Sequence, residues 1–202
     1  MNYIEFRTRM TPLTVFSLHD ARMIESDFDR RRLHEWRRKG YIESLVKGWY
    51  LFADSTIDDD CLDRIANRIY APSYVSLETV LSRMGFIPET VHSVTSIATR
   101  KTRDIRTDIA FFSYRTVSPR LFFGYEIMPH GAKVATAEKA VLDFLYLHAD
   151  LAAPEDYDSL RIERQELSDR INTDRFNDFL TRFGSKALRL RAERFMQWVR
   201  NA

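Results

Sequence analysis

The side chains best suited to chemistry in this sequence are arginines, gathered in the stretch FDRRRLHEWRRKGY. In a helix that turns by about 100° per residue, Arg31, His34 and Arg38 fall on one face, and Arg30 and Arg37 flank them. Guanidinium groups bind phosphate oxygens and pair bidentately with the edge of guanine. This face is therefore predicted to bind nucleic acid, although on its own an arginine-rich helix face is more often only solvated.

The residues before this stretch indicate how the arginines would be positioned. Ser17 is expected to cap a short helix, and residues 25–27 are expected to make a turn. Ser26, followed three residues later by Asp29, resembles a capping box and predicts the start of a second helix. That helix should end near Gly40, because glycine is favoured just past a helix C-terminus. The pattern is helix, turn, helix.

The residues after the arginines predict an anchoring face and a hairpin. Leu33 and Trp36 share the side of the second helix opposite the arginines, so this side should be buried. Residues 41–46 and 49–52 are short apolar-rich runs joined by a glycine-containing turn with Lys47 at its tip. A helix-turn-helix followed by a hairpin is the layout of a winged helix-turn-helix, whose second helix lies in the major groove of DNA.

Composition limits the other possibilities. The chain has 202 residues, 45% of them hydrophobic and 30% charged, with a formal net charge of +2. A nearly neutral chain predicts that any nucleic-acid site is a local patch. No apolar run is long enough to span a membrane, the N-terminal MNYIEFRTRM has no secretory signal, and the single cysteine, Cys61, excludes an intramolecular disulfide. We expect a cytoplasmic protein without a metal ion or cofactor.

The polar, acidic segment 54–60 is the best candidate for a domain boundary. We predict an α+β fold, with a winged helix-turn-helix over residues 1–53 and a mixed α/β domain over residues 54–202 that ends in helices. Further helices are expected at residues 2–10, 59–70 and 160–167, and after the caps Ser76, Thr136, Thr173 or Asp174, and Ser185. Strands are expected near residues 74–75, 91–99, 105–117 and 133–135. The last helix should dock on the body.

A second basic cluster lies between two of the predicted strands. It contains Arg100, Lys101 and Arg103, with Arg106 shortly after. The cluster could supply further phosphate contacts, or it could be a solvated hairpin, and the sequence favours neither.

Two other functions are weaker alternatives. A nuclease would use residues 58–60, or Glu138 with Lys139 and Asp143. Carboxylates at a helix start complement the helix dipole, and Lys139 and Asp143 form an ordinary i,i+4 pair. The sequence contains no separated Asp…Glu-x-Lys triplet, no CxxC, no HExxH and no glycine-rich phosphate loop, so we do not expect an enzyme. The third possibility is a protein-interaction module, in which the hairpin and the β-rich region bind a partner.

Several blocks resemble one family of proteins. They are FDRRRLHEWRRKGYIESLVKGWYLF, YVSLETVLSRMGFIPE, VTSIATRKTR, FFSYR, LFFGYE and VATAEKAVLDFLYL, in this order over about residues 1 to 150. Together they resemble the AbiEi-type antitoxins, also described as transcriptional regulators, of type IV toxin–antitoxin systems. The resemblance places the DNA-reading positions at Arg30, Arg31, His34 and Arg38, with Lys47 in the wing. The tail after about residue 150 shows no matching motif.

The resemblance implies a two-part protein. The N-terminal winged helix would bind inverted repeats in the promoter of its own operon and repress it, and the C-terminal domain would carry antitoxin activity. The partner would be a nucleotidyltransferase-like toxin, which the antitoxin counters without forming a stable complex. A solitary regulator without a toxin is the alternative.

Overall fold

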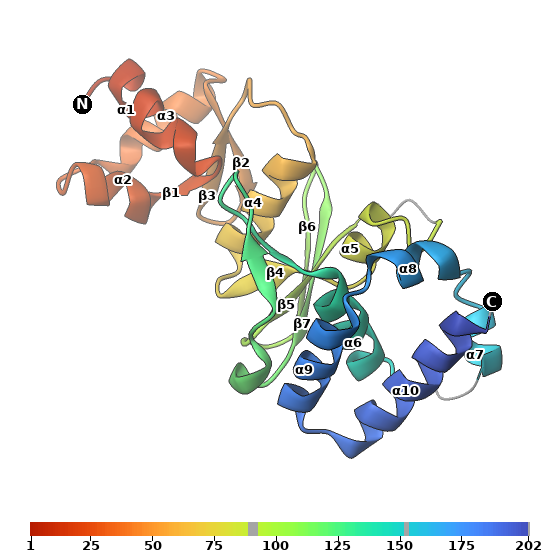
Figure 1. The fold of residues 1–202 in the computed structure, drawn as a ribbon. Helices are drawn as coiled ribbons and strands as arrows, with labels where there is room; N and C mark the ends of the chain where they lie inside the picture. The colour runs from red at the N-terminus through yellow and green to blue at the C-terminus, as the bar shows by residue number, and fades with distance from the viewer. Residues whose placement is uncertain (89–92, 152–153, 202) are drawn as a thin grey trace.

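The structure is a computed structural model that describes residues 1–88, 93–151 and 154–201. The fold is mixed, as predicted, with a small antiparallel sheet, a larger mixed sheet and a helical C-terminal tail. Figure 1 shows the N-terminal elements at one end of the molecule and the tail helices at the other, with the larger sheet between them. In the described part of the chain, no helix has both the length and the apolar character needed to cross a membrane.

The N-terminal part folds around its own small core. Its elements are α1 (Tyr3–Met10), η1 (Thr11–Leu13), β1 (Phe16–Ser17), α2 (Leu18–Ile24), α3 (Arg30–Arg38), β2 (Ile42–Val46) and β3 (Trp49–Phe52). The strands pair antiparallel in the order β1-β3-β2. The buried core residues are Phe6, Met10, Phe16, Ala21, Phe28, Leu33, Trp36, Ile42 and Phe52. A core so rich in aromatic rings buries a large apolar area with few residues.

The larger part is built on a mixed sheet of order β6-β7-β5-β4-β9-β8. Its strands are β4 (Ser73–Val75), β5 (Ser93–Ala98), β6 (Arg103–Arg106), β7 (Phe111–Thr116), β8 (Tyr125–Ile127) and β9 (Lys133–Ala135). Its helices are α4 (Asp59–Ile69), α5 (Glu78–Arg83), η2 (Pro119–Leu121), α6 (Ala137–Leu147), α7 (Pro154–Asp158), α8 (Arg164–Arg170), α9 (Thr173–Phe183) and α10 (Lys186–Arg200). The β4–β9 and β5–β7 pairs are parallel and the other pairs are antiparallel.

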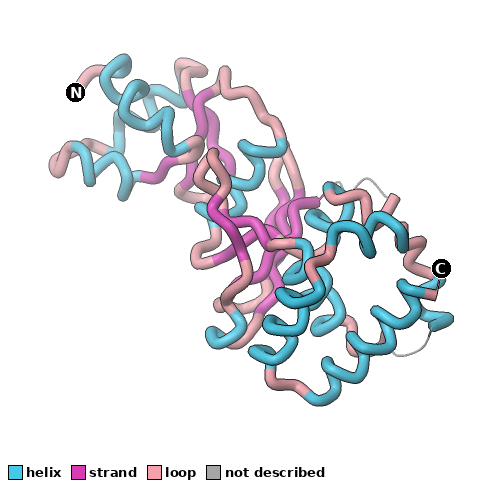
Figure 2. Tube along the Cα trace, viewed as in Figure 1, coloured by secondary structure: helices cyan, strands magenta, loops and turns pink. Residues whose placement is uncertain are grey.

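Helices cover both faces of this sheet. The hydroxyl groups of Ser73 and Tyr114 donate to the carbonyl oxygen of Ala66 in α4, at 3.4 and 2.9 Å. The hydroxyl of Tyr74, one residue after Ser73, instead reaches Asp143 of α6 at 2.8 Å. Because successive side chains of a strand point to opposite faces, α4 lies on one face and α6 on the other. Figure 2 shows the strands between these helical layers.

Among the tail helices, α9 and α10 pack on α6, and α7 and α8 pack on α10. Helix α10 contacts α6, α7, α8 and α9, as expected for a docking helix. The guanidinium of Arg191 donates to the carbonyl oxygen of Leu145 at 2.7 Å, and Tyr157 packs its ring against Phe195 and Trp198. The tail therefore belongs to the larger core.

The two cores touch each other. Val15 and Leu51 come from the N-terminal part but are buried in the larger core. The guanidinium of Arg68 in α4 donates to Asp20 of α2 at 2.8 Å and to the carbonyl oxygen of Val15 at 3.0 Å. These contacts fix the N-terminal elements against α4.

Several predicted helix caps are wrong in detail. Helix α3 is capped by Asp29 and not by Ser26, which lies in the turn. Ser76 does not cap α5, because its hydroxyl donates to Asp143 and the N-cap position is Leu77. Asn172, rather than Thr173 or Asp174, caps α9. In each case the predicted residue lies within a few positions of the helix start, where sequence patterns define ends least well.

Two predicted elements also have different bounds. Residues 91–99 and 105–117, expected to form two strands or more, contribute to β5, β6 and β7. The strand β6 already begins at Arg103, and a turn in which the Thr107 hydroxyl donates to the carbonyl oxygen of Ala110 at 2.7 Å separates it from β7. The helix expected over residues 160–167 begins only at Arg164. The first residues of the strand expected over 91–99 lie outside the described residues.

Candidate nucleic-acid interface

Helix α3 has one buried face and one cationic face. Leu33 and Trp36 are 1% and 7% exposed and belong to the small aromatic core, as predicted from their spacing. The five basic side chains that the sequence singled out on this helix are all exposed, namely Arg30, Arg31, His34, Arg37 and Arg38. The buried face holds the helix while the opposite face presents its charges to solvent.

Capping and a cation–ring contact fix the position of this helix. The Asp29 carboxylate accepts a hydrogen bond from the backbone N–H of Arg31 at 2.8 Å. Arg32, the remaining arginine of the run, pairs with Glu25 at 3.2 Å, and its guanidinium lies over the ring of Phe28 at 5.0 Å. Arg32 therefore joins the turn to the helix, whereas its neighbours face outward. Spacing alone did not assign it this role.

The preceding helix is anchored in a similar way. Ser17 and Asp20 form a capping box at the start of α2, which confirms the prediction that Ser17 caps this helix. Burial alone would raise the pKa of Asp20, but hydrogen bonds from Ser17 and the charge of Arg68 outweigh it, so its pKa lies below the usual value. Asp20 is thus held as a carboxylate between α2 and α4.

The exposed arginines border a shallow hollow. Its volume is about 320 Å³, and its lining residues are Arg30, Arg31, Leu33, His34, Arg37 and Tyr50. Tyr50 comes from β3 and was not among the predicted site residues, because strand alternation alone did not show which side it faces. Among the residues that the structure describes, no carboxylate forms an ion pair with any of the five basic side chains of this face. Their charges are therefore available to an anionic ligand.

The hairpin β2–β3 places Lys47 at its tip, where it is exposed. Gly48 follows with φ of +87°, a left-handed conformation that favours glycine. At the base of the tip, the ring of Trp49 lies 5.5 Å from the guanidinium of Arg68. The hairpin is thus supported by α4 and does not stand free.

The second basic cluster lies beside the C-terminal end of α4, the end that carries Arg68. Tyr70 directly follows α4, and its hydroxyl donates to the carbonyl oxygen of Lys101 at 2.6 Å. The guanidinium groups of Arg100 and Arg103 lie 4.5 and 5.7 Å from the centre of its ring. All three basic residues of the cluster are exposed. The C-terminal end of α4 thus contacts both basic parts of the surface: Arg68 contacts the hairpin, and the capping residue Tyr70 contacts this cluster.

The carboxylates considered for a nuclease have other contacts. Asp58 caps α4 by accepting from the backbone N–H of Cys61 at 2.8 Å. Glu138 is 2% exposed and accepts from the backbone N–H of Asn172 at 2.9 Å, which joins α6 to the start of α9. Within the described residues, no three potential ligands gather into a metal site.

Lys139 and Asp143 form a buried cluster that the sequence did not reveal. Both are completely buried, and the ammonium group of Lys139 donates to Asp143 and, at 2.7 Å, to the hydroxyl of Tyr74. Asp143 also accepts from Tyr74 and from Ser76, at 2.8 and 3.0 Å. Burial lowers the pKa of Lys139 and raises that of Asp143, and their mutual attraction opposes both changes. The i,i+4 spacing indicated an ordinary pair within one helix, whereas the pair also joins α6 to β4.

Comparisons with known proteins show the fold and nothing more specific. No protein-family model matches the chain, and no curated protein matches its sequence. Among solved structures, the chain is similar to the crystal structure of the RV2827C protein from Mycobacterium tuberculosis, with a TM-score of 0.59 and 14% sequence identity. The likeness covers 96% of this chain and 77% of that chain.

Proposed function

We propose that residues 1–53 form a winged helix-turn-helix and that the protein is a DNA-binding repressor of its own operon. The observation that carries this proposal is the division of α3 into a buried apolar face and an exposed face of five basic side chains. A helix that is anchored on one side and cationic on the other fits the major groove. The order of the surrounding elements, with α2 and a turn before α3 and a hairpin after it, supports the same function.

The contacts would divide into two kinds. Arg31, His34 and Arg38 lie along the exposed face of α3 and would reach base edges or the flanking phosphates. Lys47 at the hairpin tip would contact phosphate, as would Arg100 and its neighbours if the duplex extends along α4. Base contacts give sequence preference, whereas phosphate contacts strengthen binding to every sequence alike.

A salt-titrated anisotropy assay with the DNA just upstream of the gene tests this proposal. The protein should bind this DNA more tightly than a scrambled duplex of the same length. Replacing Arg31 and Arg38 together by alanine should remove the preference, because one good base contact is worth about 1–3 kcal/mol. Lys47→Ala should weaken binding to both duplexes and lower the salt slope by about one unit.

A matched control distinguishes the effect of the α3 arginines on DNA binding from the effect of net charge. Arg189 and Arg200 are exposed on α10, so their double alanine variant loses the same charge far along the chain. This control should bind like the parent protein. If both double variants weaken DNA binding equally, the effect is one of long-range electrostatics and not of a specific interface. If the Arg31/Arg38 variant binds DNA like the parent, the assignment of α3 as the DNA-binding helix is refuted.

We further propose that the larger part acts as the antitoxin of a type IV toxin–antitoxin system. The support is the sequence resemblance over about residues 1 to 150. The test is co-expression with a neighbouring gene for a nucleotidyltransferase-like protein, if one is present, with growth as the readout. Growth should be rescued by the parent protein and by the variant lacking Arg31 and Arg38, without a stable complex in a pull-down. A stoichiometric complex, or no rescue, would contradict this part of the proposal.

A further inference from the structure

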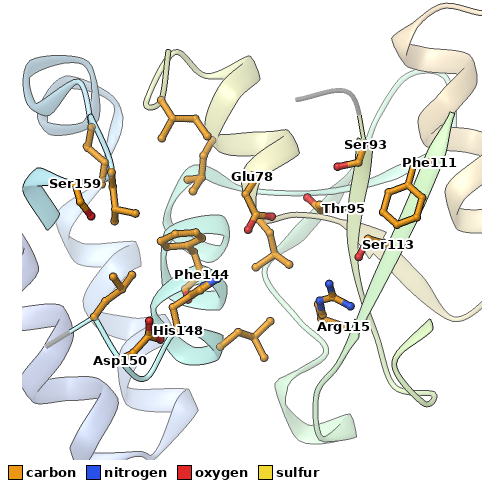
Figure 3. A pocket seen from close by; sticks show the side chains of 17 residues that line it. Glu78, Ser93, Thr95, Phe111, Ser113, Arg115, Phe144, His148, Asp150 and Ser159 are labelled. Carbon is orange, nitrogen blue, oxygen red and sulfur yellow. The ribbon is translucent and has the colours of Figure 1, made fainter. Parts of the chain in front are cut away.

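A hollow of about 890 Å³ lies between the larger sheet and the helices that cover it (Figure 3). Its floor comes from β5 and β7, and its walls come from α5, the end of α6, and the segments after α6 and before α8. The volume lies in the range of about 300–1,000 Å³ that is common for pockets that bind small molecules. The hollow shares no lining residue with the face of α3.

The floor of the hollow is unusually polar for a sheet face beneath helices. Thr95 and Ser113 are direct neighbours in the β5–β7 pair, and Arg115 lies two residues further along β7. The hydroxyl of Thr95 donates to the carbonyl oxygen of Ser76 at 2.7 Å, and that of Ser113 donates to Asp104 at 2.9 Å. The oxygen of Thr95 also accepts from the backbone N–H of Thr79 at 3.1 Å, so both its donor and an acceptor position are used within the fold. The proton of Ser113 is used as well, so its oxygen favours a ligand that donates a hydrogen bond.

The charges around the hollow are unbalanced. Arg115 is already paired with Asp104, at 3.2 Å. Glu78, in the first turn of α5, is half-buried, and it forms no ion pair or hydrogen bond with another side chain in the described part of the chain. Asp150 adds a second carboxylate at the rim. Figure 3 shows the carboxylate of Glu78 between Phe144 and the floor residue Thr95.

The walls supply apolar and aromatic surface for the rest of a ligand. Phe111 lies on the sheet side and Phe144 on the helix side (Figure 3). The ring of His148 packs against that of Phe144, with centroids 4.2 Å apart. Aliphatic side chains complete the walls, among them Leu77, Leu81, Leu147, Leu160 and Ile162. Aromatic faces attract organic cations, and such a cation would also neutralise the excess carboxylate charge.

We propose that this hollow binds a small organic cation with an apolar or aromatic body, and that the charged end of this cation pairs with the carboxylate of Glu78. The body lies between Phe111 and Phe144, and the hydroxyl oxygen of Ser113 accepts a hydrogen bond from the charged end. This binding site goes beyond the proposed DNA-binding function and does not depend on it.

Three indole compounds with the same ring system and different charges test the proposal by calorimetry on the full chain without DNA. The cation is tryptamine, the neutral analogue is N-acetyltryptamine and the anion is indole-3-propionate. Tryptamine should bind at least about tenfold more tightly than the other two, as expected for a hydrogen bond to a charged group. Glu78→Gln should remove this difference, whereas Arg115→Gln should leave tryptamine binding unchanged or strengthen it.

The matched control is Asp178→Asn, which removes a carboxylate at an exposed position of α9 outside the hollow. It should not alter the binding of tryptamine. If the Glu78 variant fails to fold, Asp150→Asn and the neutral analogue decide the question instead. The proposal is overturned if N-acetyltryptamine binds as well as tryptamine, or if none of the three compounds binds. It is also overturned if indole-3-propionate binds best and Arg115→Gln abolishes its binding.

Discussion

The buried pair of Lys139 and Asp143 gives the most direct test of the packing between α6 and β4. The ammonium group of Lys139 is surrounded by the rings of Tyr74, Phe123 and Phe183, with centroids 5.2, 5.1 and 4.8 Å away. Asp143 is the only carboxylate with which it forms an ion pair among the described residues. Asp143→Asn should therefore leave the buried ammonium group without a counter-ion, with the hydroxyl of Tyr74 as a neutral hydrogen-bond partner, while the substituted side chain keeps nearly the same shape.

The expected loss is large. Removing one partner of a buried ion pair costs about 3–5 kcal/mol, because the remaining charge is desolvated without compensation. Lys139→Met should cost less than Asp143→Asn, since Asp143 would still accept hydrogen bonds from Tyr74 and Ser76. The double variant Lys139→Met/Asp143→Asn has no unpaired charge, so it should be more stable than the sum of the single losses predicts, by about 1–3 kcal/mol.

Urea unfolding followed by circular dichroism measures these changes as shifts of the midpoint at constant slope. The proposed DNA binding of each variant, measured without urea, serves as the control, because the pair is distant in the chain from α3 and should not affect it. An Asp143→Asn protein with the midpoint of the parent would refute the reasoning. Strict additivity in the double variant would show that the two charges are not coupled.

Three further changes test other parts of the structure. Asp29→Ala should lower the free energy of unfolding by about 1 kcal/mol, measured from urea midpoints, because it removes the N-cap of α3. Gly124→Ala should cost about 1–3 kcal/mol more than Gly131→Ala in the same assay, owing to overpacking. Both glycines have positive φ, but only at Gly124 would a Cβ lie 2.9 Å from side-chain carbons of Lys139. Asp20 has a lowered pKa when folded, so its stabilisation is complete above its unfolded pKa of about 4 and is lost as the pH falls through the folded value. Asp20→Asn should therefore make urea midpoints fall less steeply at acidic pH, and an unchanged slope would show that Asp20 is not held as a carboxylate.

The sequence predicted most of the local structure because its signals are local. The spacing of Leu33 and Trp36 identified the buried side of α3, and Gly40, with φ of +71°, ends it as expected. Contacts between distant residues carry no such signal. Asp143 meets Tyr74 across 69 positions in the chain, so the sequence showed only its i,i+4 pairing with Lys139 and not the contact with β4. The hollow at Glu78 is lined by five separate segments of the chain, so it likewise left no pattern in the sequence.

The difference between local spacing and contacts with other segments also decides which arginines of α3 can bind a ligand. Helical periodicity assigns Arg30, Arg31, Arg37 and Arg38 to the outside of α3, and the structure leaves all four exposed. Helical periodicity does not show that Arg32 forms an ion pair with Glu25, because Glu25 lies outside α3, in the preceding turn. A guanidinium that already pairs with a carboxylate must lose that contact before it can bind phosphate, so its contribution to affinity is smaller. Arg32→Ala should consequently lower the stability of the α2–α3 turn, whereas Arg31→Ala and Arg38→Ala should leave stability unchanged and weaken only the DNA binding proposed above.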